Sequence, residues 1–199
     1  MLEFKTLREN SLFTESEKRS KFISYAFSVS SEEEVKGKLN SIKSKHWDAR
    51  HIVYAYRLVN NIERYSDDGE PSGTAGLPVM NAIRSFDLQN ILVVVVRYFG
   101  GILLGTSGLR KMYGSGAIGV LNQGKIATLV LCKHLIIYSD YKDYGKISHI
   151  ISKCKSLLVN TEYADKIKLD VFVRKEDLDL LVKECKDYEI LEDDYKNIL

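Results

Sequence analysis

The sequence predicts a two-domain protein of the α+β class. Hydrophobic residues make up 45% of the 199 residues and charged residues 28%, which is enough apolar material for folded cores. Residues 1–132 carry a mixture of strand-like and helical patterns. Residues 133–199 follow the order strand, helix, strand, strand, helix, strand, and this βαββαβ order is typical of the ferredoxin-like fold. We therefore expect an N-terminal α+β domain over 1–132 and a ferredoxin-like domain over 133–199.

The N-terminal domain begins with two strand-like stretches and a helix. The stretches lie on either side of Ser11, and the second covers residues 19–29. Ser31 is followed by three glutamates, a capping box that places acidic side chains at the positive end of a helix dipole. Apolar residues then recur at helical spacing, at Val35, Leu39 and Ile42. This pattern predicts an amphipathic helix over residues 32–45.

The middle of the chain alternates between strands, a loop and helices. Residues 51–59 predict a half-buried strand, with Ile52, Tyr54, Tyr56 and Leu58 on one face and polar groups on the open face. Residues 65–78 hold both prolines and show no period, which indicates a long loop. The remaining expected elements are a helix from Pro78 to about Asp87, a strand at 91–98 covered on both faces, and a helix over 109–122.

The expected elements of the second domain are regular. The apolar alternation predicts strands at 131–138, 156–163, 166–174 and 188–192, and helices at 144–154 and 176–187.

Charge and cysteine content limit the class of protein. Residues 1–132 carry 17 Lys and Arg against 13 Asp and Glu, whereas residues 133–199 carry 12 against 14, so an anionic partner should prefer the first segment. The cysteines Cys132, Cys154 and Cys185 are odd in number and widely spaced, which excludes a disulfide framework and a CxxC pair. We expect Cys154 and Cys185 to fill space in a core.

The chain shows no membrane or export signal. Its longest apolar run, Ile91–Val96, is far shorter than the roughly 20 residues that cross a bilayer. The N-terminus has no apolar signal-peptide core after a basic stretch. We therefore expect a cytoplasmic protein without membrane contact.

A glycine-rich turn over residues 99–108 is the strongest candidate for a binding site. Gly100, Gly101 and Gly105 allow backbone N–H groups to point toward one place, and Thr106 or Ser107 is expected to cap the following helix, whose N-terminus attracts anions. The dinucleotide pattern GxGxxG is absent, and Thr106 occupies the position of the P-loop lysine, so both nucleotide motifs are excluded. Anion binding and tight helix–sheet packing are equally favoured by these residues alone.

The acidic loop after residue 66 is a second candidate. Asp67, Asp68 and Glu70 could hold Mg²⁺, although a solvated acidic turn is the favoured interpretation. The rest of the loop is small and polar, with Gly69, Ser72, Gly73 and Thr74.

Basic side chains on the tyrosine-rich strand are a third candidate. Arg50, His51 and Arg57 are interleaved with Tyr54 and Tyr56, a combination that suits single-stranded nucleic acid. The favoured alternative places the tyrosines in the core and the arginines in solvent. No GxSxG, HExxH or cysteine–histidine signature is present, so we predict no catalytic residue, no metal ligand and no cofactor.

Several of these segments together resemble the IMPACT/YigZ family. The matching stretches are SKF at 20–22, DARH at 48–51, SDDGEPSGTAGLP at 66–78 and VVRYFGGILLGTSGL at 95–109. The sequence departs from the family pattern at Val53, where a cysteine is usual, and at Ile52, where a second histidine is common. These departures count against a thiol or a histidine pair on that strand.

The resemblance implies a fold and a class of function. It implies an N-terminal domain like the second domain of a ribosomal small-subunit protein, and a C-terminal domain like the last domain of translocating elongation factors. Family members are associated with regulation of translation. Kinase inhibition in the eukaryotic members depends on an extra N-terminal module to which nothing in these 199 residues corresponds.

These observations favour a non-catalytic protein that binds RNA or the ribosome. Arg97 and Lys111 would neutralise phosphate near the glycine turn, with the acidic loop as the rim of the site. One alternative is a metal-assisted hydrolase that uses Asp67, Asp68 and Glu70. Another is an adaptor that holds a protein partner through the C-terminal domain.

Overall fold

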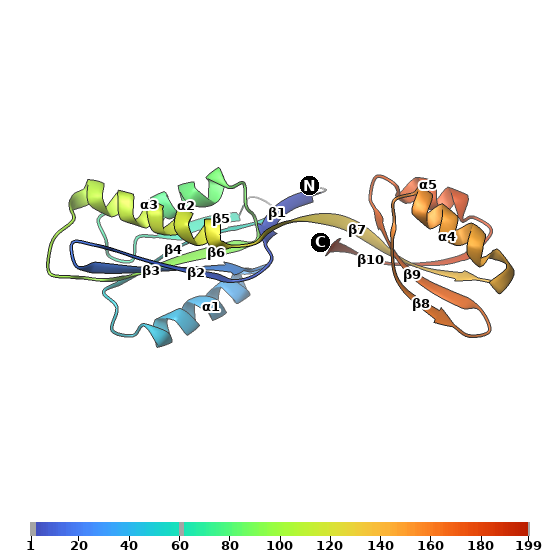
Figure 1. Cartoon of the computed structure of the whole chain (residues 1–199), viewed down its shortest axis with the longest axis horizontal. Coiled ribbons are helices and arrows are strands. Elements are labelled where there is room, and N and C mark those ends of the chain that lie inside the picture. The colour runs from blue at the N-terminus through green and yellow to red at the C-terminus, as the bar shows by residue number, and fades with distance from the viewer. Residues whose placement is uncertain (1–2, 60–61, 199) are drawn as a thin grey trace. The chain divides into compact units, whose positions relative to one another are not determined.

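The protein divides into two compact units in a computed structural model that describes residues 3–59 and 62–198 (Figure 1). The first unit is Lys5–Ala127. The second unit runs from Thr128 onward and also includes the start of the chain up to Phe4. The boundary predicted at residue 132 falls inside strand β7 (Ile126–Ser139).

The first unit is built on a five-stranded antiparallel sheet. Its order is β2-β3-β6-β4-β5, with strands β2 (Ser11–Glu17), β3 (Ser20–Ser28), β6 (Ile91–Tyr98), β4 (His51–Leu58) and β5 (Ile62–Ser66). The central strand β6 is buried along its whole length up to Arg97, as its continuous apolar run predicted.

Helices cover both faces of this sheet (Figure 1). They are α1 (Glu32–Lys45) on one face, and α2 (Gly76–Ser85) and α3 (Gly105–Gln123) on the other. The Ser31 side chain accepts a hydrogen bond from the Glu34 N–H at 3.2 Å, which confirms the predicted start of α1. Strand β4 differs from the prediction, because Val53 and Ala55 are fully buried in one core while Ile52 and Tyr56 lie in the other. It is a covered strand, and no open polar face exists over its middle.

The segment predicted as one long loop contains regular structure at both ends. β5 ends at Ser66 and α2 begins at Gly76, two residues before Pro78. The loop itself is therefore confined to residues 67–75.

Glycines in α3 let that helix pack closely on the sheet. A Cβ on Gly119 would lie 2.5 Å from the Phe13 ring, and one on Gly116 would lie 2.7 Å from Ser24 Oγ. Both distances are too short for real contacts, so packing explains these two glycines. The N-terminus of α3 faces the same end of the sheet as the glycine-rich turn.

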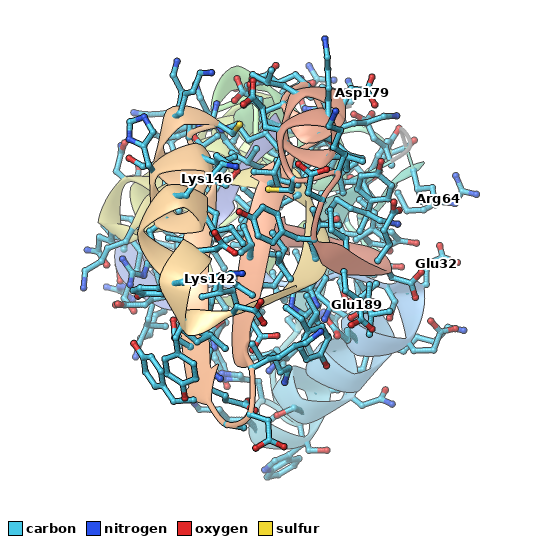
Figure 2. All side chains as sticks on the ribbon, turned by 90° about the vertical axis from the view of Figure 1, so that its right-hand side faces the viewer. Glu32, Arg64, Lys142, Lys146, Asp179 and Glu189 are labelled. Carbon is cyan, nitrogen blue, oxygen red and sulfur yellow. The ribbon has the colours of Figure 1, made fainter. Side chains whose placement is uncertain are left out.

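The second unit has the predicted βαββαβ order. Its elements are β7, α4 (Tyr144–Lys153), β8 (Leu157–Tyr163), β9 (Ile167–Arg174), α5 (Leu178–Glu184) and β10 (Glu189–Ile198). β10 pairs with β7, β7 with β9 and β9 with β8, all antiparallel, and β1 (Glu3–Leu7) also pairs with β7. In Figure 2, which faces this unit, the exposed Lys146 and Asp179 mark its helical side. The α+β class and the ferredoxin-like topology of this unit are confirmed.

The three cysteines are buried and unpaired. Cys154 and Cys185 belong to the core of the second unit, and burial raises the pKa of the Cys185 thiol to about 11. Burial also raises the pKa of Cys132 and Cys154. Cys154 and Cys185 therefore fill space in a core, as predicted. Within residues 3–59 and 62–198, no helix is long and apolar enough to span a bilayer.

Candidate functional site

Four loops meet at the C-terminal end of β6. Arg97 on β6 is in register with His51 on β4 and with Phe22 on β3. The Arg50 N–H donates to the Arg97 carbonyl oxygen at 3.1 Å, and the Gly100 N–H donates to Ser20 Oγ at 3.2 Å. We call this end the four-loop surface, formed by residues 18–21, 46–50, 67–75 and 99–104; it lies at the left-hand end of the first unit in Figure 1.

Asp67 closes the acidic loop onto the start of α2. Its Oδ1 accepts hydrogen bonds from the N–H groups of Ala75 at 2.9 Å and Gly76 at 2.8 Å, and its Oδ2 accepts one from Gly73 at 2.9 Å. These donors lie at the positive end of a helix dipole, where a carboxylate is stabilised. Asp67 therefore fixes the loop and is fully engaged as an acceptor.

Asp68 ties the same loop to β4. Its Oδ2 accepts a hydrogen bond from the Ile52 N–H at 2.6 Å, and its carbonyl oxygen lies 2.8 Å from His51 Nδ1. A carbonyl oxygen only accepts, so the Nδ1 of His51 carries the proton. The other ring nitrogen, Nε2, then points toward Glu70, with 3.7 Å between Nε2 and Oε1.

The remaining carboxylate of the loop, Glu70, is buried. Its Oε1 accepts hydrogen bonds from Arg97 Nη1 at 2.6 Å and from the Tyr113 hydroxyl at 2.8 Å. The Glu70 and Arg97 side chains are only 4% and 6% exposed. Burial, followed by the charge of Glu70, raises the pKa of the Tyr113 hydroxyl, so this group stays protonated and donates. Glu70 thus lies inside the site, whereas the sequence suggested a position on its rim.

Arg97 is held between two aromatic rings. Its guanidinium carbon lies 5.6 Å from the centre of the Phe22 ring and 5.5 Å from that of Phe99. Such contacts attract a cation to the ring faces. Because Glu70 already compensates its charge, Arg97 does not serve as the free surface cation that the sequence suggested.

A cavity of about 240 Å³ opens beside this ion pair. The residues that line it come from the acidic loop, from β6 and from the glycine turn with the first turns of α3: Glu70, Pro71, Arg97, Leu103, Leu104, Gly105, Thr106 and Leu109. The structure therefore brings the two candidate loops together around one hollow.

The glycine-rich turn combines packing with an unusual backbone. A Cβ on Gly100 would lie 2.0 Å from the carbonyl carbon of Arg19, so Gly100 is required for packing. Gly101 and Gly105 have φ angles of +85° and +73° with open space around them, so they are required for conformation. Helix α3 begins at Gly105 without any side-chain cap, and Thr106 and Ser107 are both exposed. The predicted cap by Thr106 or Ser107 is wrong, and the first N–H groups of α3 stay open.

Exposed cations and aromatic side chains lie on the loops at this end of the sheet. Lys18, Arg19, Lys21 and Arg50 are exposed, and none of them forms an ion pair within the described part of the chain. Trp47 is 83% exposed, Phe99 46% and Leu103 82%. Of this group the sequence singled out only Arg50 as a site residue. For Lys18, Arg19 and Lys21 the available signal was their clustering between two strand-like stretches.

His46 anchors the loop that carries Trp47. One ring nitrogen lies 2.8 Å from the Tyr25 hydroxyl and the other 2.8 Å from the Tyr98 hydroxyl. Burial, and then the charge of Lys45, lowers the pKa of His46, so the ring is neutral at pH 7. The loop backbone is thus fixed while the Trp47 indole faces solvent.

Two predicted site residues lie elsewhere. Arg57 is in register with Ile91 at the start of β6, about 20 Å along β4 from His51. It forms ion pairs with Glu63 at 3.2 Å and Asp87 at 3.5 Å, so grouping Arg57 with Arg50 and His51 is wrong. Lys111 is exposed on α3 beyond the residues that line the cavity.

The other residues of the acidic loop shape its backbone. Thr74 is buried and its hydroxyl donates to the Pro71 carbonyl oxygen at 2.6 Å. Gly69 and Gly73 have φ angles of +82° and +70°, and Gly69 and Ser72 are exposed.

Comparison with known proteins shows the family of the chain. Residues 18–121, more than half of the chain, match the family model described as the Impact N-terminal domain. The chain belongs to the IMPACT family. Residues 139–184 match a domain of unknown function, DUF1949. The four-loop surface lies within the part of this IMPACT family member that matches the Impact N-terminal domain.

The family includes bacterial proteins of similar length. The IMPACT family member YvyE of Bacillus subtilis is 34% identical over 161 residues, which cover 80% of this chain and 74% of that protein. YigZ of Escherichia coli is 33% identical over 150 residues, which cover 73% of this chain and 74% of that protein. A crystal structure described as that of a hypothetical protein aligns with a TM-score of 0.68 at 27% identity, and the alignment covers 98% of each chain. The resemblance found in the sequence is confirmed.

Proposed function

We propose that this IMPACT family member binds single-stranded RNA, free or on the ribosome, through the four-loop surface, and thereby acts in the regulation of translation without catalysis of its own. The observation that carries the proposal is the combination of unpaired cations with exposed aromatic rings on one surface. Arg19, Lys21 and Arg50 provide charge, and Trp47 and Phe99 provide ring faces. Single-stranded nucleic acid is bound by this combination, since cations follow its phosphates and bases stack on the rings.

The carboxylates of the acidic loop are held by donors of the protein itself. They accept hydrogen bonds from the backbone of α2, from β4 and from the Arg97–Tyr113 pair. Arg97 compensates the charge of Glu70, so Glu70 adds no net negative charge to the surface. The charges that face solvent at this end are the cations Lys18, Arg19, Lys21 and Arg50 and the exposed carboxylates of Asp48 and Asp68.

The same contacts give no support to a metal-assisted hydrolase. Asp67, Asp68 and Glu70 each have their own protein donors, so the three carboxylates do not converge on one point. Within residues 3–59 and 62–198, no group of three or more His, Cys, Asp or Glu is arranged to hold a metal ion.

Salt dependence of RNA binding tests the proposal. If about four phosphates are neutralised, the logarithm of the association constant falls against the logarithm of salt concentration with a slope near −3. Fluorescence anisotropy with labelled single-stranded RNA, and co-sedimentation with ribosomes, would measure this. Binding that does not respond to salt, or no binding in either assay, contradicts the proposal.

A charge-matched pair of variants locates the surface. Arg19→Ala with Lys21→Ala removes two cations from the four-loop surface and should reduce the slope by about 1.4. Lys5→Ala with Lys36→Ala removes two exposed cations of the same unit that lie away from this end, and should leave the slope unchanged. An equal reduction of the slope by both pairs of substitutions would mean that binding depends on net charge alone. The adaptor alternative predicts instead that deletion of residues 134–199 removes capture of a protein partner while the affinity for RNA survives.

A further inference from the structure

The cavity beside Glu70 and Arg97 has apolar walls and a polar floor. Most of its wall is apolar and is formed by Pro71, Leu103, Leu104 and Leu109. The buried ion pair of Glu70 and Arg97 also lines the cavity, and we call this part the floor. A volume of about 240 Å³ is below the roughly 300–1,000 Å³ of sites for drug-sized ligands. The cavity therefore suits one flat heterocycle better than a whole nucleoside triphosphate.

The floor retains unused hydrogen-bonding capacity. Arg97 donates a hydrogen bond from Nη1 to Glu70. Its Nε is buried with no hydrogen-bond partner in the described part of the chain. The Oε1 of Glu70 accepts hydrogen bonds from Arg97 and Tyr113, whereas its Oε2 has no protein donor among the described residues. A buried polar atom without a partner is costly, so Arg97 Nε favours a ligand that completes its hydrogen bonding. The two charged residues that line the cavity thus bring a donor and an acceptor to its lining.

We infer that this cavity receives one unstacked base of a bound RNA strand. The inference rests on the proposed function and names what one part of the four-loop surface recognises. Every nucleobase carries a donor next to an acceptor on its Watson–Crick edge, which matches Glu70 Oε2 beside the Arg97 guanidinium, and proteins read unstacked RNA bases on that edge. The apolar walls cover the faces of the ring. The adjoining phosphate then lies near the open N–H groups at the start of α3.

The charges at the floor argue for a base and against a free anion. Glu70 lines the cavity and would repel a phosphate, although the Glu70–Arg97 pair is neutral as a whole. A neutral heterocycle meets no such repulsion and can use both partners. The base therefore enters the cavity and the phosphate stays outside it.

A single labelled base tests the inference. The probe is a short single-stranded RNA with one 2-aminopurine, whose emission rises when the base leaves its stack, and the control RNA lacks the base at that position. We expect emission to rise on binding and the abasic RNA to bind about tenfold more weakly, the loss typical of one base contact. Unchanged emission together with equal affinity for the two RNAs would overturn the inference.

A variant whose cavity is filled by a side chain provides the second test. Thr106→Phe fills the mouth of the cavity, whereas Ser107→Phe places the same ring on the neighbouring exposed position, which does not line it. We expect only Thr106→Phe to abolish the emission change and to bring the affinity for intact RNA down to that for abasic RNA, while the salt slope is preserved. If Thr106→Phe binds both RNAs like the unmodified protein, the base-binding inference fails and RNA binding by the surface survives. If the unmodified protein binds neither RNA, the proposed function itself fails.

Discussion

Glu70 and Arg97 show how one pair of side chains organises the site. Both are almost fully buried, and each has a second group of contacts: Tyr113 for the glutamate, and two aromatic rings for the arginine. A buried ion pair gains little net free energy, because desolvation offsets the attraction, but leaving one member alone is costly. The pair therefore fixes the geometry of the floor more than it stabilises the fold.

Breaking the pair on one side should destabilise the protein strongly. Arg97→Met leaves the Glu70 carboxylate buried and uncompensated, and should lower the free energy of unfolding by about 3–5 kcal/mol. Adding Glu70→Gln in the same chain should restore much of that loss, because no unpaired charge remains. Urea denaturation of both single variants and the double variant checks this. Strictly additive losses would show that the two side chains do not depend on each other.

The sequence predicted which motifs form the site but not the burial of these residues. Glu70 follows two aspartates and precedes a proline, a pattern typical of a solvated turn. The burial of Arg97 does have a signal in the sequence. It directly follows six apolar residues of a covered strand, and a cation at such a position needs a partner. The identity of that partner depends on the path of the loop over residues 67–75, which no local pattern determines.

At the scale of elements, the regular parts of the chain followed their periodicity. The predicted helix over residues 32–45 has the bounds of α1, and the predicted strand over 91–98 has those of β6. The segment over 65–78 was predicted less well, because β5 is a short edge strand with mixed burial and α2 starts in a run of small residues. Such elements are fixed by tertiary contacts, here the Asp67 carboxylate on the first amides of α2.

The contact between the glycine turn and the β2–β3 turn should tolerate no side chain. Gly100→Ala would force a Cβ into the Arg19 backbone, which cannot move away as a flexible side chain could, and should cost about 3 kcal/mol. Gly37→Ala is the matched control, since this helical glycine has open space around it and alanine there should stabilise α1 by about 0.5–1 kcal/mol. Thermal unfolding of the two variants measures both effects. A Gly100→Ala protein as stable as the parent would refute this account of the turn.

At the scale of the whole molecule, strand β1 contributes to both units. Its residues up to Phe4 belong to the second unit, and from Lys5 onward it belongs to the first. The second unit is therefore discontinuous in sequence, although its βαββαβ order lies in one continuous stretch. The sequence predicts a single boundary near residue 132, because no local pattern shows that β1 pairs with β7.

The first residues of β1 should support the second unit selectively. Phe4 is 8% exposed, and Phe4→Ala should weaken that unit by about 3 kcal/mol. Amide hydrogen exchange should accelerate in β9, for example at Leu169, while Val94 in β6 keeps its protection. Phe13→Ala, which removes a ring packed on the core of the first unit, should have the opposite pattern. Equal acceleration in both units after either change would contradict this division.

The division of β1 also bears on the order in which the protein is completed as it is synthesised. The strands and helices of the first unit, residues 5–127, are all made before β9 and β10 exist, so this unit has every partner it needs while the chain is still growing. Phe4 must wait for β7 and for the rest of its own sheet. The four-loop surface is therefore complete before β10 is made, and β10 and β1, far apart in the sequence, then meet on the same strand, β7.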